Sequence, residues 1–150
     1  MLTIKYIIRE TKKYGNGIFT LEDIKKDTII WFYKLDINVL EFDEKTTYQY
    51  LNQLQNLEKQ QNFLNMSFGK QEILCYILDD GKYINHANTE NILCNCKTDL
   101  ETGNCYAKRD IKAGEQLFED YRSFSHPDFL YKLLDKYKCI PTYYELPKNN

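Results

Sequence analysis

Three short groups of residues have side chains or backbone that could bind or transform a ligand. They are Gly15-Asn16-Gly17, Asn85-His86 and Tyr121. Glycines allow the backbone to approach a ligand closely, and Asn and His offer both donors and acceptors. The glycine pair precedes a β-branched and aromatic segment rather than a helix, so by itself it indicates a hairpin turn and not a phosphate loop. Taken singly, Asn-His also fits an ordinary turn, and one tyrosine of 13 fits a packed aromatic.

The order of these groups along the chain is more informative than any one of them. Gly-x-Gly-x-Phe leads into a predicted strand, Tyr-Ile-Asn-His follows at 83–86, and AKRDIKAGEQLFEDY at 107–121 ends on Asp-Tyr. This pattern closely resembles the SET-domain family of protein lysine methyltransferases. The resemblance extends from YGNGIF to EDYRSF. It implies one SET domain over residues 1–150, with an α+β, mostly β fold of the β-clip type.

The resemblance also assigns expected roles to individual residues. In the family, the backbone of the Gly-x-Gly segment holds the methionine end of S-adenosylmethionine, and this segment falls on Gly15, Asn16 and Gly17. The family's Asn-His pair contacts the amino-acid and adenine ends of the cofactor, and it falls on Asn85 and His86. The terminal tyrosine of the family motif, which is catalytic, falls on Tyr121. The implied partner is a lysine-bearing protein or peptide, such as a histone tail.

The implied reaction explains why a tyrosine is enough. Methyl transfer from a sulfonium to an amine requires alignment of nitrogen, methyl and sulfur, which is largely a positioning task. The target lysine has a free pKa of about 10.4 and must lose a proton. An apolar channel disfavours its ammonium form, and the Tyr121 hydroxyl can then orient the neutral amine. This chemistry needs no metal, and we expect none.

The chain departs from the family at several positions. Many relatives continue Asn-His with Ser-Cys, where this chain has Ala87 and Asn88. Many also close the site with a cysteine-rich zinc segment after the tyrosine, whereas only Cys139 follows Tyr121 here. We therefore expect residues 122–150, with a helix after Pro127 and the aromatic pair Tyr143-Tyr144, to close the channel instead.

Glu119 is the departure with the clearest chemical consequence. The position two residues before the family tyrosine is usually Phe or Tyr and sets how many methyl groups are added. In a strand, Glu119 and Tyr121 would share one face and look toward the lysine channel, with Asp120 turned away. The alternative is that the strand ends early and Glu119 points to solvent, as most glutamates do.

The five cysteines suggest a second chemistry, a zinc-dependent interaction domain. Cys94 and Cys96 alternate in ILCNCK and would share one strand face. Zinc sites usually have longer spacers and four ligands, so buried reduced thiols explain the pattern better.

The elements that must position the candidate site follow from local patterns. We expect strands at 2–10, 17–24 and 28–34, a helical insertion at about 43–65, and a strand and turn within 72–84. A hairpin is predicted around TDLETG, then a strand in GEQLFEDY. Ser125 could cap a final helix, which Pro141 would stop. Its apolar stripe is Phe129, Leu130, Leu133, Leu134 and Tyr137.

Composition limits the classes of protein. A net charge of -2 is unlike the basic field of a nucleic-acid binder, and the longest apolar run, Ile29 to Tyr33, is too short to span a membrane. The N-terminus lacks the features of a signal peptide, so we expect an intracellular protein.

A SET-like peptide-binding module without turnover is the alternative to an enzyme.

Overall fold

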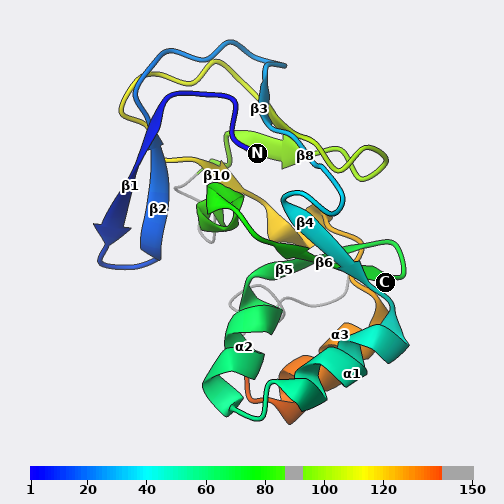
Figure 1. Cartoon of the computed structure of the whole chain (residues 1–150). Helices are drawn as coiled ribbons and strands as arrows, with labels where there is room; N and C mark the ends of the chain where they lie inside the picture. The colour runs from blue at the N-terminus through cyan, green and yellow to red at the C-terminus, as the bar shows by residue number, and fades with distance from the viewer. Residues whose placement is uncertain (87–92, 140–150) are drawn as a thin grey trace.

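The computed structural model describes residues 1–86 and 93–139 of the chain. Within these ranges short β-strands predominate, and three α-helices gather at one end of the molecule, below the strands in Figure 1. The predicted α+β class is therefore confirmed. None of the helices in the described ranges is long and apolar enough to cross a lipid bilayer.

The first hairpin pairs β1 (Tyr6–Thr11) with β2 (Gly15–Thr20) in antiparallel register. Its turn comprises residues 12–14, so the prediction that Gly-Asn-Gly forms the turn is wrong: this segment begins β2. Gly15 has a φ of +64°, a left-handed conformation that glycine adopts without the steric cost of a Cβ atom. The hairpin therefore presents the Gly-Asn-Gly backbone at the start of a strand.

The five-stranded sheet contains the strands from the most distant parts of the sequence. Its order is β3 (Ile29–Trp31), β9 (Cys105–Ala107), β8 (Cys96–Thr98), β10 (Phe118–Glu119) and β7 (Asn85–His86). β8 and β9 form the hairpin predicted around TDLETG. β10 lies between β8 and β7 and runs parallel to both. Parallel neighbours cannot be joined by a tight turn, so these pairings bring together residues far apart in the chain.

A three-stranded antiparallel sheet lies between the five-stranded sheet and the helices (Figure 1). Its order is β4 (Val39–Phe42), β6 (Ile73–Ile77) and β5 (Ser67–Lys70). Residues of both sheets and of the hairpin bury their side chains in one apolar cluster, which includes Ile18, Ile30, Cys75 and Leu117, each 0% exposed. This first core packs the two sheets and the hairpin together, and these elements carry the site described below.

The helical insertion consists of two helices rather than the single helix expected. α1 (Glu44–Gln53) and α2 (Leu57–Asn65) are separated at Gln55, whose φ of +43° interrupts the helical backbone. The Asn56 side chain then accepts a hydrogen bond from the backbone N–H of Lys59 and caps α2. The apolar residues Tyr48, Leu51, Leu54 and Leu57 recur every three residues across this break, so the sequence pattern predicts one continuous helix. Leu57 is 55% exposed and is not part of the buried stripe.

The last helix, α3 (Asp128–Lys136), packs against α1, α2 and β6 in a second apolar cluster. Its predicted stripe is confirmed, because all five residues are buried: Phe129, Leu130, Leu133, Leu134 and Tyr137. The prediction that Ser125 caps this helix is wrong. The cap position is Pro127, which makes no side-chain capping bond. Pro141 and Tyr143-Tyr144 lie outside the described residues.

The cysteines are mostly buried thiols, as predicted, but their predicted arrangement is wrong. β8 begins at Cys96, so Cys94 precedes the strand and does not share a strand face with it. Cys75, Cys96, Cys105 and Cys139 are buried, and Cys94 is partly exposed. In the described ranges no group of three or more His, Cys, Asp or Glu side chains is placed to hold a metal ion.

Candidate active site

The parallel pairing of β7 with β10 joins two of the three groups singled out from the sequence. Phe118 lies opposite Asn85, and Glu119 lies opposite His86. Asn95 supports β10 from its other side: its side-chain amide donates to the Gln116 carbonyl at 2.8 Å, and its side-chain oxygen accepts from the Phe118 N–H at 2.8 Å. β10 is short, so these side-chain bonds supply the support that a longer ladder would give.

The Gly-Asn-Gly segment is joined to the same region by Asn85. The Asn85 side-chain amide donates to the carbonyl of Asn16 at 2.9 Å. A Cβ atom at Gly17 would lie 2.3 Å from Gln116 Nε2 and 3.1 Å from Asn85 Nδ2. The expectation was that Gly17 leaves room for a ligand, whereas its neighbours in the structure are two side chains of the protein. Glycine there allows Gln116 and Asn85 to pack against β2.

Gln116 is a site residue that the sequence reasoning missed. Its backbone carbonyl accepts from Asn95, and its side-chain nitrogen is buried without a hydrogen-bond partner among the described residues. A buried amide nitrogen without a partner costs free energy, so this position favours a ligand that supplies an acceptor. The signal in the sequence was its place within GEQLFEDY, the predicted strand that leads to Tyr121.

His86 connects β7 to the residues that follow β10. Its side chain is buried, and its Nδ1 accepts a hydrogen bond from the backbone N–H of Tyr121 at 3.1 Å. Burial lowers the pKa of His86, and the nearby Asp120 carboxylate opposes this shift. A neutral imidazole with Nδ1 as acceptor carries its proton on Nε2. The ring therefore holds the Tyr121 backbone through Nδ1, which also lies 3.3 Å from the carbonyl oxygen of Glu119.

Tyr121 lies in a short 3-10 turn, η2 (Tyr121–Ser123), directly after β10. Its hydroxyl donates a hydrogen bond of 2.5 Å to the carbonyl of Ile84, the residue before β7. Its ring packs beside those of His86 and Phe124, with centroid distances of 5.3 Å and 5.4 Å. These contacts fix the position of the hydroxyl at one wall of a pocket.

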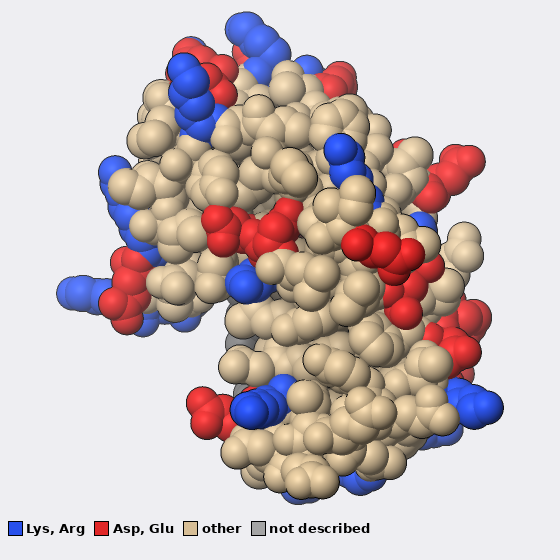
Figure 2. Space-filling model, viewed as in Figure 1, with Lys and Arg blue, Asp and Glu red and all other residues tan. Residues whose placement is uncertain are grey.

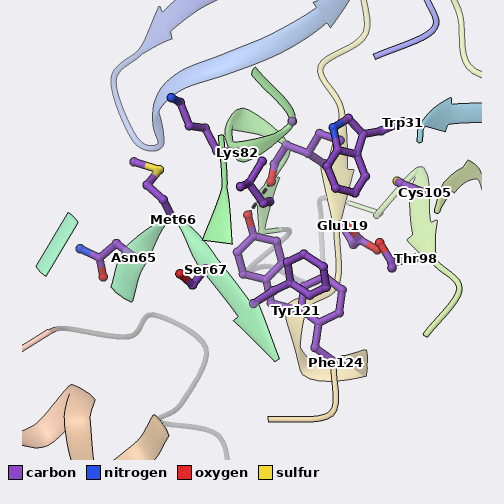
Figure 3. Close-up of a pocket in the computed structure, with 14 residues that line it drawn as sticks. Trp31, Asn65, Met66, Ser67, Lys82, Thr98, Cys105, Glu119, Tyr121 and Phe124 are labelled. Carbon is purple, nitrogen blue, oxygen red and sulfur yellow. Dashed lines mark hydrogen bonds between the residues drawn. The ribbon is translucent and has the colours of Figure 1, made fainter. Parts of the chain in front are cut away.

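This pocket lies between the two larger sheets and is lined mainly by apolar side chains, including Trp31, Phe68, Ile84 and Phe124. In Figure 3 Tyr121 lies between Ser67 and Met66 on one side and Glu119 and Thr98 on the other. An apolar pocket with a few convergent polar groups is the usual form of a binding site for a small group.

Glu119 faces this pocket and not the solvent. It is 4% exposed, whereas Asp120 turns outward and pairs with Arg122, with Oδ1 2.6 Å from Nε. The alternation expected for this strand is therefore present, and the alternative in which Glu119 points to solvent is wrong. Burial raises the pKa of Glu119 to about 7, against an opposing effect of Thr98. One carboxyl oxygen, Oε1, is buried without a hydrogen-bond partner among the described residues.

A family model, the SET domain, matches residues 15–122. The chain belongs to the SET-domain family. The matched residues include the first glycine of the Gly-Asn-Gly segment and extend just past Tyr121. The positions expected to correspond to the family's Ser-Cys, Ala87 and Asn88, lie outside the described residues.

Two solved structures are similar to this chain. ctPRC2, in an autoinhibited conformation bound to S-adenosylmethionine, is 20% identical with a TM-score of 0.59, over 95% of this chain and 19% of that chain. A candidate histone methyltransferase from Plasmodium falciparum is 19% identical with a TM-score of 0.49, over 85% of this chain and 99% of that chain. No curated protein sequence matches this SET domain. At these identities the structural likeness concerns the fold alone.

Proposed function

We propose that this SET domain is an S-adenosylmethionine-dependent protein-lysine methyltransferase. The observation that carries the proposal is that hydrogen bonds link three distant segments, and that the last of them, at Tyr121, lines an apolar pocket. Asn85 reaches Asn16, His86 holds the backbone of Tyr121, and the Tyr121 hydroxyl reaches Ile84 at the pocket wall. The family match supports the same activity, since SET domains are typically lysine methyltransferases.

The residues present fit the proposed cofactor. Gly15 and Asn16 are exposed, and Asn85 is only partly buried, so backbone and amide groups are accessible beside one another. Gln116 adds a buried amide nitrogen without a partner among the described residues. The methionine end of S-adenosylmethionine is a zwitterion, which needs such donors and acceptors together. When bound, the cofactor supplies the methyl group, and we assign its binding to Gly15, Asn16, Gly17, Asn85 and His86.

In this proposal Tyr121 is the catalytic residue. Its hydroxyl orients the lysine nitrogen and stabilises charge as the methyl group is transferred. The apolar pocket wall disfavours the ammonium form of the lysine. The decisive experiment is transfer of a radiolabelled methyl group from S-adenosylmethionine to a panel of lysine peptides. Histone-tail peptides are the first class to include. Absence of transfer to every peptide and protein tested would reject the proposal.

The charge distribution also favours a protein substrate over a nucleic acid. Figure 2 shows basic and acidic side chains interspersed, with no large basic field on the face in view. The net charge of -2 gives no general attraction to phosphate backbones.

Replacing His86 with Ala is expected to weaken cofactor binding. The variant loses polar contacts worth roughly 1–3 kcal/mol, or about a 5- to 150-fold rise in Kd. Titration calorimetry with S-adenosylmethionine or its demethylated product measures this change. Asn52→Ala on the exposed face of α1 is the control and should bind like the wild type. A folded His86→Ala variant with unaltered affinity would remove His86 from the site.

Replacing Glu119 with Phe is expected to shift the product toward higher methylation. The carboxylate can accept hydrogen bonds from a nitrogen that still carries protons, so it holds mono- and dimethyl-lysine better than trimethyl-lysine. We therefore propose that the wild type stops at mono- or dimethylation. Mass spectrometry of a peptide after long reaction at alkaline pH measures the product. A wild type that reaches trimethyl-lysine, or a variant with the same products, would contradict this role.

The second candidate function is a lysine-binding module without turnover. The observation that favours it is Glu119 itself, because a buried carboxylate in an apolar pocket could retain an ammonium group. This candidate predicts peptide binding without label transfer in the same panel. It also predicts that the binding of S-adenosylmethionine is not required for peptide binding.

A further inference from the structure

We propose that Glu119 is the proton acceptor of this site, taking a proton from the ammonium group of the bound lysine before methyl transfer. The proposal rests on the lysine methyltransferase function proposed above. It goes beyond that function because the removal of the lysine proton is assigned to one side chain of this chain. Desolvation and Tyr121 alone would otherwise have to accomplish this step.

The geometry that carries the inference is the shared pocket. Glu119 and Tyr121 are two residues apart and both line it, so a lysine side chain that enters the pocket meets both side chains. In Figure 3 the Glu119 carboxyl group lies beside Thr98. Glu119 is 4% exposed, and its Oε1 has no hydrogen-bond partner in the described part of the chain. The orphaned oxygen can therefore accept a hydrogen bond from a ligand without giving up an existing one.

The groups around Glu119 do not neutralise it. Among the described residues, none of the ion pairs includes Glu119, although Lys82 also lines the pocket. From β8, hydrogen bonds from Thr98 lower the pKa of Glu119, and Asp120, the residue after β10, raises it. From β9, the buried Cys105 has a pKa well above its usual value, so it stays a neutral thiol.

Other neighbours are His86, opposite Glu119 on β7, Cys96, opposite it on β8, and Tyr121. Burial lowers the pKa of His86, so that ring is neutral at pH 7 and adds no counter-charge. A carboxylate buried without a cation attracts one from outside, and the ammonium group of lysine is such a cation. The site is therefore built to bind a proton-bearing nitrogen.

The step transfers one proton from the lysine ammonium group to the Glu119 carboxylate. One N–H bond of the lysine ammonium breaks, an O–H bond forms on Glu119, and the nitrogen lone pair becomes available for the methyl group. Glu119 then releases the proton to solvent, so each methyl transfer yields one proton overall. Burial raises the pKa of Glu119 to about 7 and so brings it closer to that of the amine. A base with a pKa near the working pH is the most effective proton acceptor.

The first experiment measures Glu119 directly and needs no cofactor. Carboxyl carbons of glutamate are labelled with carbon-13 in the whole chain, and the Glu119 signal is identified by its loss in Glu119→Gln. We expect n-butylammonium, which matches the end of a lysine side chain, to lower the pH midpoint of Glu119, because a nearby cation favours the carboxylate. Neutral 1-butanol is the control and should leave the midpoint unchanged. Equal midpoints with both probes would overturn the proposal.

The second experiment compares pH profiles of kcat/KM for the wild type and Glu119→Gln, with the best peptide of the panel. The wild-type profile should rise and level off near the measured midpoint of Glu119. The variant should lose at least about tenfold at neutral pH and continue to rise into the alkaline range, since general base catalysis contributes at least that much. A peptide with the less basic S-aminoethyl-cysteine in place of lysine should restore the variant more than it accelerates the wild type.

The outcomes separate this proposal from the proposed function. Parallel pH profiles in an active wild type and variant would overturn only the role of Glu119. A wild type that transfers no methyl group would overturn the proposed function and this role with it.

The folding of each variant is checked by thermal unfolding. The raised pKa of Glu119 means that wild-type stability falls as pH rises from about 4.5 through about 7, so Glu119→Gln should be at least as stable at neutral pH.

Discussion

Tyr121→Phe is expected to lower turnover by at least about tenfold, or 1.4 kcal/mol of barrier, with cofactor affinity nearly unchanged. The ring remains and keeps its packing against His86 and Phe124. Only the hydroxyl is lost, and with it the group that we expect to orient the lysine nitrogen. The measurement is kcat with saturating peptide, together with titration calorimetry of the cofactor.

The structure adds a second consequence to this substitution. The hydroxyl donates to the Ile84 carbonyl at 2.5 Å, so the variant should also lose roughly 0.5–1.5 kcal/mol of folding stability. Tyr48→Phe is a matched control, since Tyr48 packs at the second core and away from the pocket. It should retain full turnover. Wild-type kcat in a folded Tyr121→Phe variant would contradict the catalytic role of the hydroxyl.

Gly69→Ala is expected to destabilise the fold by about 1–3 kcal/mol, because it overpacks a close contact between β5 and the segment after Tyr121. A Cβ atom there would lie 2.4 Å from the Ser125 carbonyl oxygen and 2.7 Å from the His126 Cα. Both are backbone atoms, which cannot rotate away as a side chain could. The segment would have to shift, and Phe124, whose ring packs 5.1 Å from that of Phe68, would shift with it.

The measurement for Gly69→Ala is thermal unfolding, with a melting temperature expected to fall by several degrees for a chain of this size. Glu72→Ala, exposed in the turn after β5, is the control and should change stability by less than about 0.5 kcal/mol. Because the contact holds one wall of the pocket, the Gly69 variant should also lose methyl transfer. An unchanged melting temperature would show that the 125–127 segment yields without cost.

The sequence by itself determined the family, the α+β class and the residues that converge. The motifs can be recognised in the sequence because each depends on its own residue types. Gly15 adopts a left-handed φ, and Asn85 and His86 supply polar groups. The apolar stripe of α3 was also correct, because an amphipathic helix of nine residues has a clear period. The expected hairpin around TDLETG was found for a similar local reason.

Only the tertiary structure decided features that depend on neighbours distant in sequence. The need for glycine at position 17 comes from Gln116 and Asn85, which lie about 70 or more residues away in the chain and only meet it after folding. The break at Gln55 follows from the cap at Asn56, which the continuing apolar spacing concealed. The direction of Glu119 was open in the sequence, because the pattern does not fix where the strand in GEQLFEDY ends. Its burial is set by the parallel pairing of β10 between β7 and β8, which places that side chain in the wall of the apolar pocket.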